Sequence, residues 1–332
     1  VSMVRRRMKS PTLKTVMMTI GDRSNTDVSV CYLTDKADVN TVNAVIDKLK
    51  NIPLNTIVSS EYLQSFLEPG GSTLFSQISV TERPDVFVSK LYEGRVGIIV
   101  DGTPFALVLP CLFAENFVTM DDYSHKSYFS AFLRTIRFFA FIAAAVLPGL
   151  YVALCNFHPE MFRTGLLLNI YSSVQTTAYP VFGECLIMYI LYEIMREAGL
   201  RLPRSVGHAV SIVGGLVIGE ISVSAGLMSA PVVLIIAATG LCSFAVPDLY
   251  DICMILRLVF IVAGGALGLF GITVCGTVIF FRICAKNAYG VPYTAPFAPV
   301  TIKSIMRDTF FRASWKRLSG SDMTVQQLSG KA

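Results

Sequence analysis

The chain has 332 residues, of which 53% are hydrophobic and only 15% are charged, and its formal net charge is +5. Globular proteins carry about 25% charged residues, so this composition argues against a soluble protein and indicates a membrane protein. The basic excess lies in residues 285–332, which hold seven basic and two acidic side chains. A basic tail suits the anionic cytoplasmic face of a membrane better than it suits nucleic acid, so we expect membrane lipid as a partner and no nucleic acid.

Residues 1–110 are predicted to form an α/β domain. Two runs rich in β-branched residues, 13–20 and 27–33, have the composition of strands. Asp38 can cap a helix over 39–49, whose apolar positions recur at helical spacing.

The second half of this domain contains a helix and a hairpin. Pro84 is suited to the first turn of a helix that runs to Tyr92. Two apolar runs then flank Asp101-Gly102, a strong turn dipeptide, which predicts a β-hairpin rather than a catalytic aspartate. Residues 111–127 follow as an amphipathic connector to the membrane.

Residues 128–284 are predicted to form an all-α polytopic membrane domain of five or six segments, because each crossing needs about 20 apolar residues. Five stretches are candidates, namely 138–157, 179–195, 204–231, the short 232–246 and 258–281. Positive residues around 196–204, the basic tail of 285–332 and the absence of an export signal all favour cytoplasmic ends, which requires an even number of crossings. Either 164–178 or the glycine-rich 258–282 is then re-entrant or split, or the tail lies on the other side.

The stretch 204–231 is long enough to cross a bilayer, yet it is rich in small residues and carries one acid. One helix face holds four candidates for the lining of a pore, Val213, Val217, Glu220 and Ser224. Another face holds Gly215 and Gly219 at the G-x-x-x-G spacing that permits close helix packing. The alternative is that both faces make ordinary contacts between helices.

Two further features of the membrane domain are unusual. Gly264 and Gly268 repeat the G-x-x-x-G spacing, which predicts a second packing face. Glu184 and Glu193 are acids within apolar sequence, which predicts either an ion path or bland roles as interhelical hydrogen-bonding partners or, for Glu193 in particular, as a boundary residue. Arg257 lies near a membrane boundary.

Motifs for catalysis and metal binding are absent from the sequence. The eight cysteines include no C-x-x-C pair, and the three histidines have no partner at metal-ligand spacing. Phosphate-binding loops, the dinucleotide fingerprint and the G-x-S-x-G elbow are also missing. We therefore expect no enzyme, no cofactor and no metal site.

Several colinear stretches resemble the A subunit of GerA-type spore germination receptors. They are TERPD (81–85), LYEGRVGIIVDGTPFALVLP (91–110), DDYSHKSYFSAFLRTIRF (121–138), the stretch 196–231 and GVPYTAPFAP (290–299). The resemblance implies a cytosolic N-terminal domain, a membrane domain of several spans and residence in the inner membrane of a bacterial spore. It also implies a permease-like B subunit and a lipoprotein C subunit as partners, and a homo-oligomer that forms an ion channel opened by nutrient.

The chain also departs from the family pattern. Relatives usually continue upstream of the position of Val1, so we expect the N-terminal domain to be incomplete. In the family, charged residues are common near positions 174 and 175, and an acid is common near position 189. This chain has Val174, Gln175 and Tyr189 at these positions. The family also includes a sporulation-associated branch that resembles the receptor A subunits, and the sequence is compatible with either branch. A secondary transporter and a non-conducting scaffold for the partner subunits stay as alternative functions.

Overall fold

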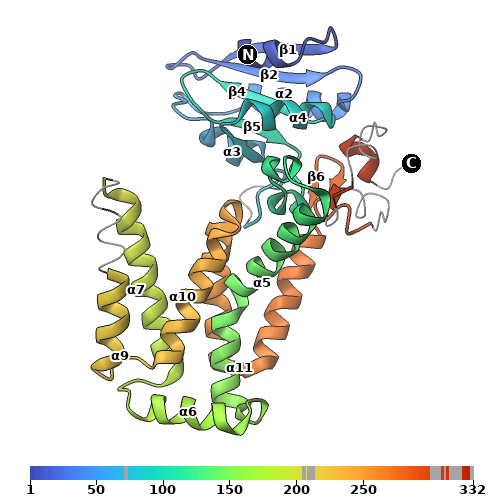
Figure 1. Ribbon diagram of the computed structural model, residues 1–332. Helices are drawn as coiled ribbons and strands as arrows, with labels where there is room; N and C mark the ends of the chain where they lie inside the picture. The colour runs from blue at the N-terminus through green and yellow to red at the C-terminus, as the bar shows by residue number, and fades with distance from the viewer. Residues whose placement is uncertain are drawn as a thin grey trace. The chain divides into compact units, whose positions relative to one another are not determined.

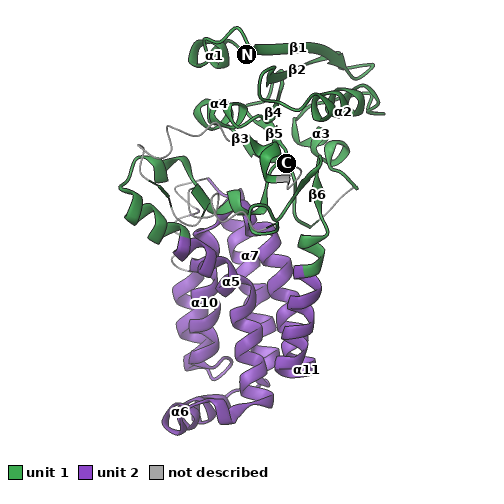
Figure 2. Cartoon of the chain, turned by 90° about the vertical axis from the view of Figure 1, so that its right-hand side faces the viewer, with its two compact units in different colours: residues 1–134, 281–332 green, residues 135–280 purple. Residues whose placement is uncertain are grey.

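The computed structural model describes residues 1–70, 74–203, 207, 214–299, 308–309, 312–313 and 324–329. The chain divides into two compact units, which Figure 2 draws in green and purple. Unit 1 comprises residues 1–134 and 281–332, and unit 2 comprises residues 135–280. The N-terminal domain and the C-terminal tail thus belong to one unit, and the helices between them form the other.

Unit 1 is built on an antiparallel sheet of five strands in the order β1-β2-β4-β5-β3. The strands are β1 (Leu13–Ile20), β2 (Thr26–Leu33), β3 (Ser79–Thr81), β4 (Val96–Val100) and β5 (Ala106–Leu109). The helices of this part are α1 (Ser2–Arg7), α2 (Val39–Lys50), α3 (Glu61–Leu67) and α4 (Pro84–Tyr92). The predicted α/β class and the predicted strands and helices are therefore confirmed, whereas α1, α3 and β3 were not predicted.

Local signals in the sequence explain several boundaries of these elements. The Asp38 carboxylate accepts a hydrogen bond from the backbone N–H of Thr41 at 3.0 Å and so caps α2. Between β4 and β5 the chain turns at Asp101-Gly102, where Gly102 adopts a φ of 76° that a side chain would disfavour. The role of Asp101 as a turn residue is thus confirmed.

Helices cover both faces of the sheet. On one face, Val45 and Leu49 of α2 and Leu63 of α3 join Val30 of β2 in one buried cluster. On the other face, Val4 of α1 and Phe87 and Leu91 of α4 pack against Cys31 of β2. Because successive side chains of a strand alternate between the two faces, β2 contributes to both layers, and its residues from Val28 to Cys31 are all buried.

Unit 1 contains a largely buried cluster of charges around Arg95. The guanidinium of Arg95 donates to Glu115 at 2.7 Å and to the carbonyl of Pro110 at 2.6 Å, and Lys90 also pairs with Glu115. Burial acts to raise the pKa of the Glu115 carboxyl, but the charges of Arg95 and Lys90 outweigh it, so this pKa lies below its ordinary value.

The connector and the tail complete unit 1. The predicted connector forms two 3-10 helices, η1 (Phe113–Phe117) and η2 (Met120–Tyr123). In the tail, the short strands β6 (Asn287–Ala288) and β7 (Val291–Pro292) pair, and a 3-10 helix η7 (Val325–Ser329) follows. The N–H of Phe113 donates to the carbonyl of Tyr293 at 2.9 Å, so the tail packs directly on the connector.

Unit 2 is helical. Its elements are α5 (Ser127–Phe157), which begins in unit 1, η3 (Pro159–Met161), α6 (Thr164–Gln175), α7 (Val181–Arg201), a π-helical turn η4 (Val217–Ile221), α9 (Ser222–Ser224), α10 (Ala230–Phe244), η5 (Pro247–Leu249) and α11 (Tyr250–Cys284), which ends in unit 1 (Figure 1). Two stretches, Ser127–Phe157 and Pro247–Cys284, are long and apolar enough to cross a membrane. The segments Gly214–Ser224 and Ala230–Phe244 are shorter apolar helices.

Helix α11 is not straight. At Gly268 the backbone has φ 63° and ψ −146°, a conformation that ends one helix and starts another. A Cβ on Gly276 would lie 4.0 Å from the ring of Phe260, although 16 residues of straight helix would separate these positions by about 24 Å. The two halves of α11 therefore lie side by side as a helical hairpin, and the half after Gly268 is a separate rod in Figure 1.

Candidate functional site in the helical unit

The predicted pore-lining face lies on the short segment that contains η4 and α9. Val217, Glu220 and Ser224 are all exposed, with 41% of Val217 accessible. Val213 lies outside the described residues. Among the residues that the structure describes, Glu220 has no side-chain hydrogen bond or ion pair, so its carboxylate is available to solvent or to another chain.

The π-helical turn of η4 contains both Val217 and Glu220. Such turns are rare, and they occur most often as single bulges at functional positions. The exposed face formed by Val217, Glu220 and Ser224 is called the Glu220 face below.

The four glycines predicted to pack between helices have different environments. Among the residues that the structure describes, a Cβ on Gly215 would meet none within 4 Å, and one on Gly219 would make an ordinary contact of 3.7 Å with Val233. In contrast, a Cβ on Gly264 would collide with the carbonyl oxygen of Gly149 in α5. Gly264 thus allows α11 to touch the backbone of α5, whereas a packing role for Gly215 and Gly219 stays a prediction about contacts with another chain.

Gly268, the fourth glycine, is the point where α11 reverses. Its spacing predicts a place in a helix-packing motif, and a Cβ at this position would indeed lie 3.0 Å from the ring of Phe157. Its positive φ gives it a turn-forming role in addition to this contact. Spacing alone does not distinguish these two roles.

Glu184 is fully buried and joins the N-terminal ends of two helices. It lies in the first turn of α7, and its Oε2 atom accepts from the backbone N–H of Ser229 at 3.0 Å. Ser229 is the N-cap residue of α10, and its hydroxyl donates to the same carboxylate, while the hydroxyl of Thr177 donates to Oε1. The first N–H groups of a helix have no partner within the helix, and this carboxylate accepts from one such group at the start of α10.

Glu193 belongs to a second polar cluster, in which α5, α7, α10 and α11 meet. Its Oε1 atom accepts from Nη1 of Arg257 at 3.2 Å. Its Oε2 atom accepts from Arg196 at 3.1 Å and from the hydroxyl of Tyr250 at 2.9 Å. The carboxylate is therefore paired on both oxygens.

Arg257 is fully buried, and its guanidinium reaches three helices besides its own. Nη2 donates to the hydroxyl of Ser243 in α10 at 2.5 Å, and Nε donates to the backbone carbonyl of Ala144 in α5 at 2.9 Å. In a regular helix this carbonyl would accept from the N–H four residues later, but that residue is Pro148, which has no N–H. Arg257 therefore supplies the hydrogen bond that the proline removes.

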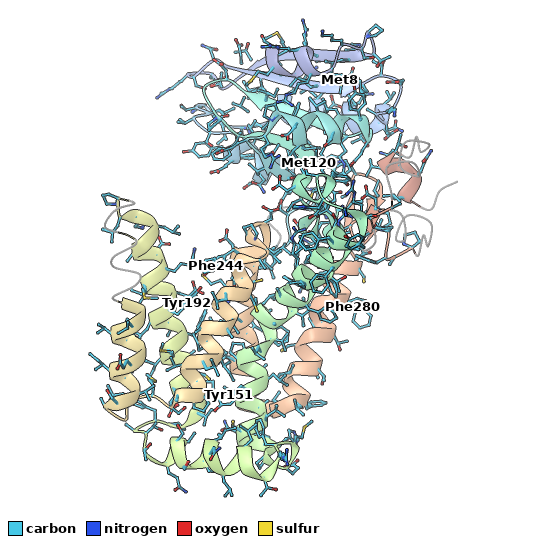
Figure 3. The ribbon with its side chains drawn as sticks, in the orientation of Figure 1. Met8, Met120, Tyr151, Tyr192, Phe244 and Phe280 are labelled. Atoms are coloured by element: carbon cyan, nitrogen blue, oxygen red, sulfur yellow. The ribbon has the colours of Figure 1, made fainter. Side chains whose placement is uncertain are left out.

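Aromatic side chains surround the guanidinium of Arg257. It lies 5.5 Å from the ring centre of Tyr189 and 5.8 Å from that of Tyr192. Tyr192 lies between α7 and α10, where a Cβ on Gly240 would come within 2.7 Å of its hydroxyl (Figure 3). The hydroxyl of Tyr189 donates to the backbone carbonyl of Met254 at 2.9 Å.

The geometry assigns different roles to the predicted residues. Glu184 and Glu193 are interhelical hydrogen-bonding partners in separate clusters, and neither shares a cluster with Glu220. The partnership between Pro148 and Arg257 was not predicted, although a proline inside an apolar run signals a carbonyl without a donor.

Comparison with known proteins identifies the family. A model of the Bacillus/Clostridium GerA spore germination protein family matches residues 1–322. Spore germination protein KA of Bacillus subtilis is 38% identical over 317 residues, which are 95% of this chain and 58% of that protein. Spore germination protein GerLA of Bacillus cereus is 33% identical over 93% of this chain and 63% of its own length. The uncharacterized membrane protein YfkQ of Bacillus subtilis is 33% identical over 99% of this chain and 64% of its own length.

One solved structure is also similar, the N-terminal domain of the A subunit of the Bacillus megaterium spore germinant receptor GerK3. It is 43% identical, covers 34% of this chain and 89% of that chain, and has a TM-score of 0.28. The chain spans 58 to 64% of the length of the curated relatives named above. It is a membrane protein with apolar helices. On the match over residues 1–322, the chain belongs to the Bacillus/Clostridium GerA spore germination protein family.

Proposed function

We propose that this chain is the A subunit of a nutrient-sensing germination receptor, and that several copies form an ion channel that opens when nutrient is sensed. Membership of the GerA family supports the receptor role. The Glu220 face supports the channel role, because it presents an acid and an aliphatic side chain on the outside of an apolar helical segment. The partners would be a permease-like B subunit and a lipoprotein C subunit, in the inner membrane of the spore with unit 1 in the cytosol.

A ring of Glu220 carboxylates, one from each copy, would attract cations to a narrow point. Val217 precedes Glu220 by about one turn on the same face, so a ring of Val217 side chains would form an apolar constriction next to the acids. An apolar constriction loses its water when it is narrow, which closes the path without a physical plug.

Six crossings fit this subunit better than five. The N-terminal part and the tail belong to the same compact unit, which supports placing both on one side of the membrane and therefore an even number of crossings. In this arrangement the α11 hairpin would contribute two crossings, and α5, α7, the segment that ends at Ser224 and α10 would contribute four. In single-cysteine variants, Glu160→Cys and Leu267→Cys should react with an impermeant reagent from the outer side only, and Lys286→Cys from the cytosolic side only.

The test of the channel is ion flux through the purified receptor in liposomes. Glu220→Gln keeps the shape of the side chain and should lower cation conductance or selectivity without loss of assembly. Val217→Ser should hydrate the constriction and give flux without nutrient. Glu197→Gln serves as the control, since Glu197 is an exposed acid near the end of α7. Unchanged flux in both variants, at normal protein levels, would contradict the pore role of the Glu220 face. Flux that follows the gradient of a transported solute would instead favour a secondary transporter.

A further inference from the structure

The stretch 121–138 carries part of the family resemblance, but the proposed channel gives it no role. Within it, Asp122 and Arg134 form an ion pair of 3.2 Å, and each side chain is only 1% exposed. Arg134 belongs to the second turn of α5, the first membrane helix. A buried ion pair at this position carries a desolvation cost that only further polar partners offset.

The C-terminal tail supplies those partners. Nη1 of Arg134 donates to the Asp308 carboxylate at 3.1 Å, to the Asp308 carbonyl at 2.9 Å and to the Thr309 carbonyl at 3.2 Å. The hydroxyl of Tyr123 donates to the other carboxylate oxygen of Asp308 at 2.8 Å. Asp308 therefore accepts from two residues of the segment around the start of α5.

Arg312 makes a second connection between the tail and this segment. It is 4% exposed and donates to the backbone carbonyls of Asp122 at 3.0 Å and of Tyr123 at 3.1 Å. The guanidinium carbons of Arg312 and Arg134 lie 5.4 and 5.5 Å from the ring centre of Tyr123, so one aromatic ring contacts both cations. We call the side chains of Asp122, Tyr123, Arg134, Asp308 and Arg312 the tail lock.

The tail lock joins parts of the chain that lie before and after the whole helical unit. Its partners are 174 to 190 residues apart in sequence. One side of the lock is at the start of α5, and the other side lies in the tail that follows the end of α11 at Cys284. Any movement of the start of α5 relative to the tail must break buried, charge-assisted hydrogen bonds, which are stronger than neutral ones.

We propose that the tail lock is a releasable device that fastens the start of the first membrane helix to the C-terminal tail, so that both ends of the helical unit move together. Its partners are charged or hydroxyl groups rather than an apolar core, so the two sides separate into water at lower cost than two apolar surfaces. The lock does not depend on whether the chain conducts ions. If the proposed channel is correct, the lock transmits movement of unit 1 to α5.

The direct test is amide hydrogen exchange of residues 127–134 in the full chain, reconstituted in nanodiscs. Asp308→Ala and Arg312→Gln should each speed the exchange of these amides by about tenfold or more, because each removes a partner from a buried charge cluster. Tyr123→Phe removes only one hydroxyl and should give a smaller increase, which keeps the test interpretable if a stronger variant fails to fold.

Asp121→Asn is the matched control, because Asp121 precedes Asp122 directly but is 74% exposed and pairs at the surface with Arg83. Exchange in all the lock variants that is no faster than in this control would overturn the proposal. Nutrient-evoked ion flux gives a separate result: if the parent conducts, the lock variants should lose this response while they retain assembly. A parent that does not conduct would contradict the proposed function and leave the exchange test of the lock intact.

Discussion

The hydrogen bond between Arg257 and the Ala144 carbonyl allows a direct test of how unit 2 is stabilised. Arg257→Met keeps a long side chain but removes every donor, so it breaks a buried ion pair with Glu193 and leaves the Ala144 carbonyl without a donor. Removal of one partner of a buried pair costs about 3–5 kcal/mol, and of this the unpaired carbonyl accounts for about 1–3 kcal/mol. The free energy of unfolding should fall accordingly.

The second substitution of the cycle is Pro148→Ala, which restores the backbone N–H that normally bonds the Ala144 carbonyl. In the parent this N–H is not needed, because Arg257 already donates to the carbonyl at 2.9 Å. In the Arg257→Met background, the restored N–H should bond the unpaired carbonyl and regain the free energy of unfolding lost there. The two substitutions should therefore be coupled by about 1–3 kcal/mol.

Denaturant unfolding of the four proteins of the cycle in detergent micelles measures this coupling. Pro231→Ala, combined with Arg257→Met, is the control, because Pro231 lies in the first turn of α10 where no helical hydrogen bond is lost. That pair should be additive. If the effects of Pro148→Ala and Arg257→Met also add to within about 0.5 kcal/mol, the two residues do not act on the same carbonyl of Ala144, and the reasoning is refuted.

Three further outcomes follow from the same kind of reasoning. Glu184→Ala should lower the free energy of unfolding by about 1–2 kcal/mol in micelles, because Ser229 loses the acceptor at the start of α10. The pKa of Glu115 is lower in the folded than in the unfolded protein, so its contribution to stability is present above its ordinary pKa of 4.5 and is lost as the pH falls. In an acid titration followed by circular dichroism, the stability of Glu115→Gln should therefore decline less steeply than that of the parent. Gly264→Leu should destabilise the purified monomer, whereas Gly215→Leu should not, since only the first Cβ would collide with a neighbouring backbone.

Much of unit 1 was predictable because its signals are local. The strands at 13–20 and 27–33 follow from runs of β-branched residues, and the hairpin follows from Asp101-Gly102, a turn dipeptide between two apolar runs. Asp38 caps α2 through a backbone N–H three residues away. In each case the interacting groups are neighbours in sequence, so pattern and spacing carry the information.

The tail lock and the Arg257 cluster were not predictable in this way, because their partners are far apart in the chain. Arg134 and Asp308 are 174 residues apart, and Arg257 and Ala144 are 113 residues apart. The sequence does show the residue types that take part. A buried arginine needs hydrogen-bond acceptors, and a proline within a helix leaves one backbone carbonyl without a donor. Which arginine reaches which carbonyl depends on the packing of four helices, and this is not encoded by any local motif.

The glycines of α11 show how two kinds of sequence evidence have to be combined. Spacing alone assigns Gly264 and Gly268 to one packing motif, yet Gly264 touches the backbone of α5 and Gly268 reverses the chain. Charge distribution adds a second expectation, because the cytoplasmic ends that it predicts would require an even number of crossings, whereas the predicted apolar stretches number five. A reversal inside the glycine-rich 258–282 satisfies that expectation, and a positive φ is accessible there at little steric cost only to glycine. The hairpin at Gly268 is therefore the solution that both the charges and the backbone favour.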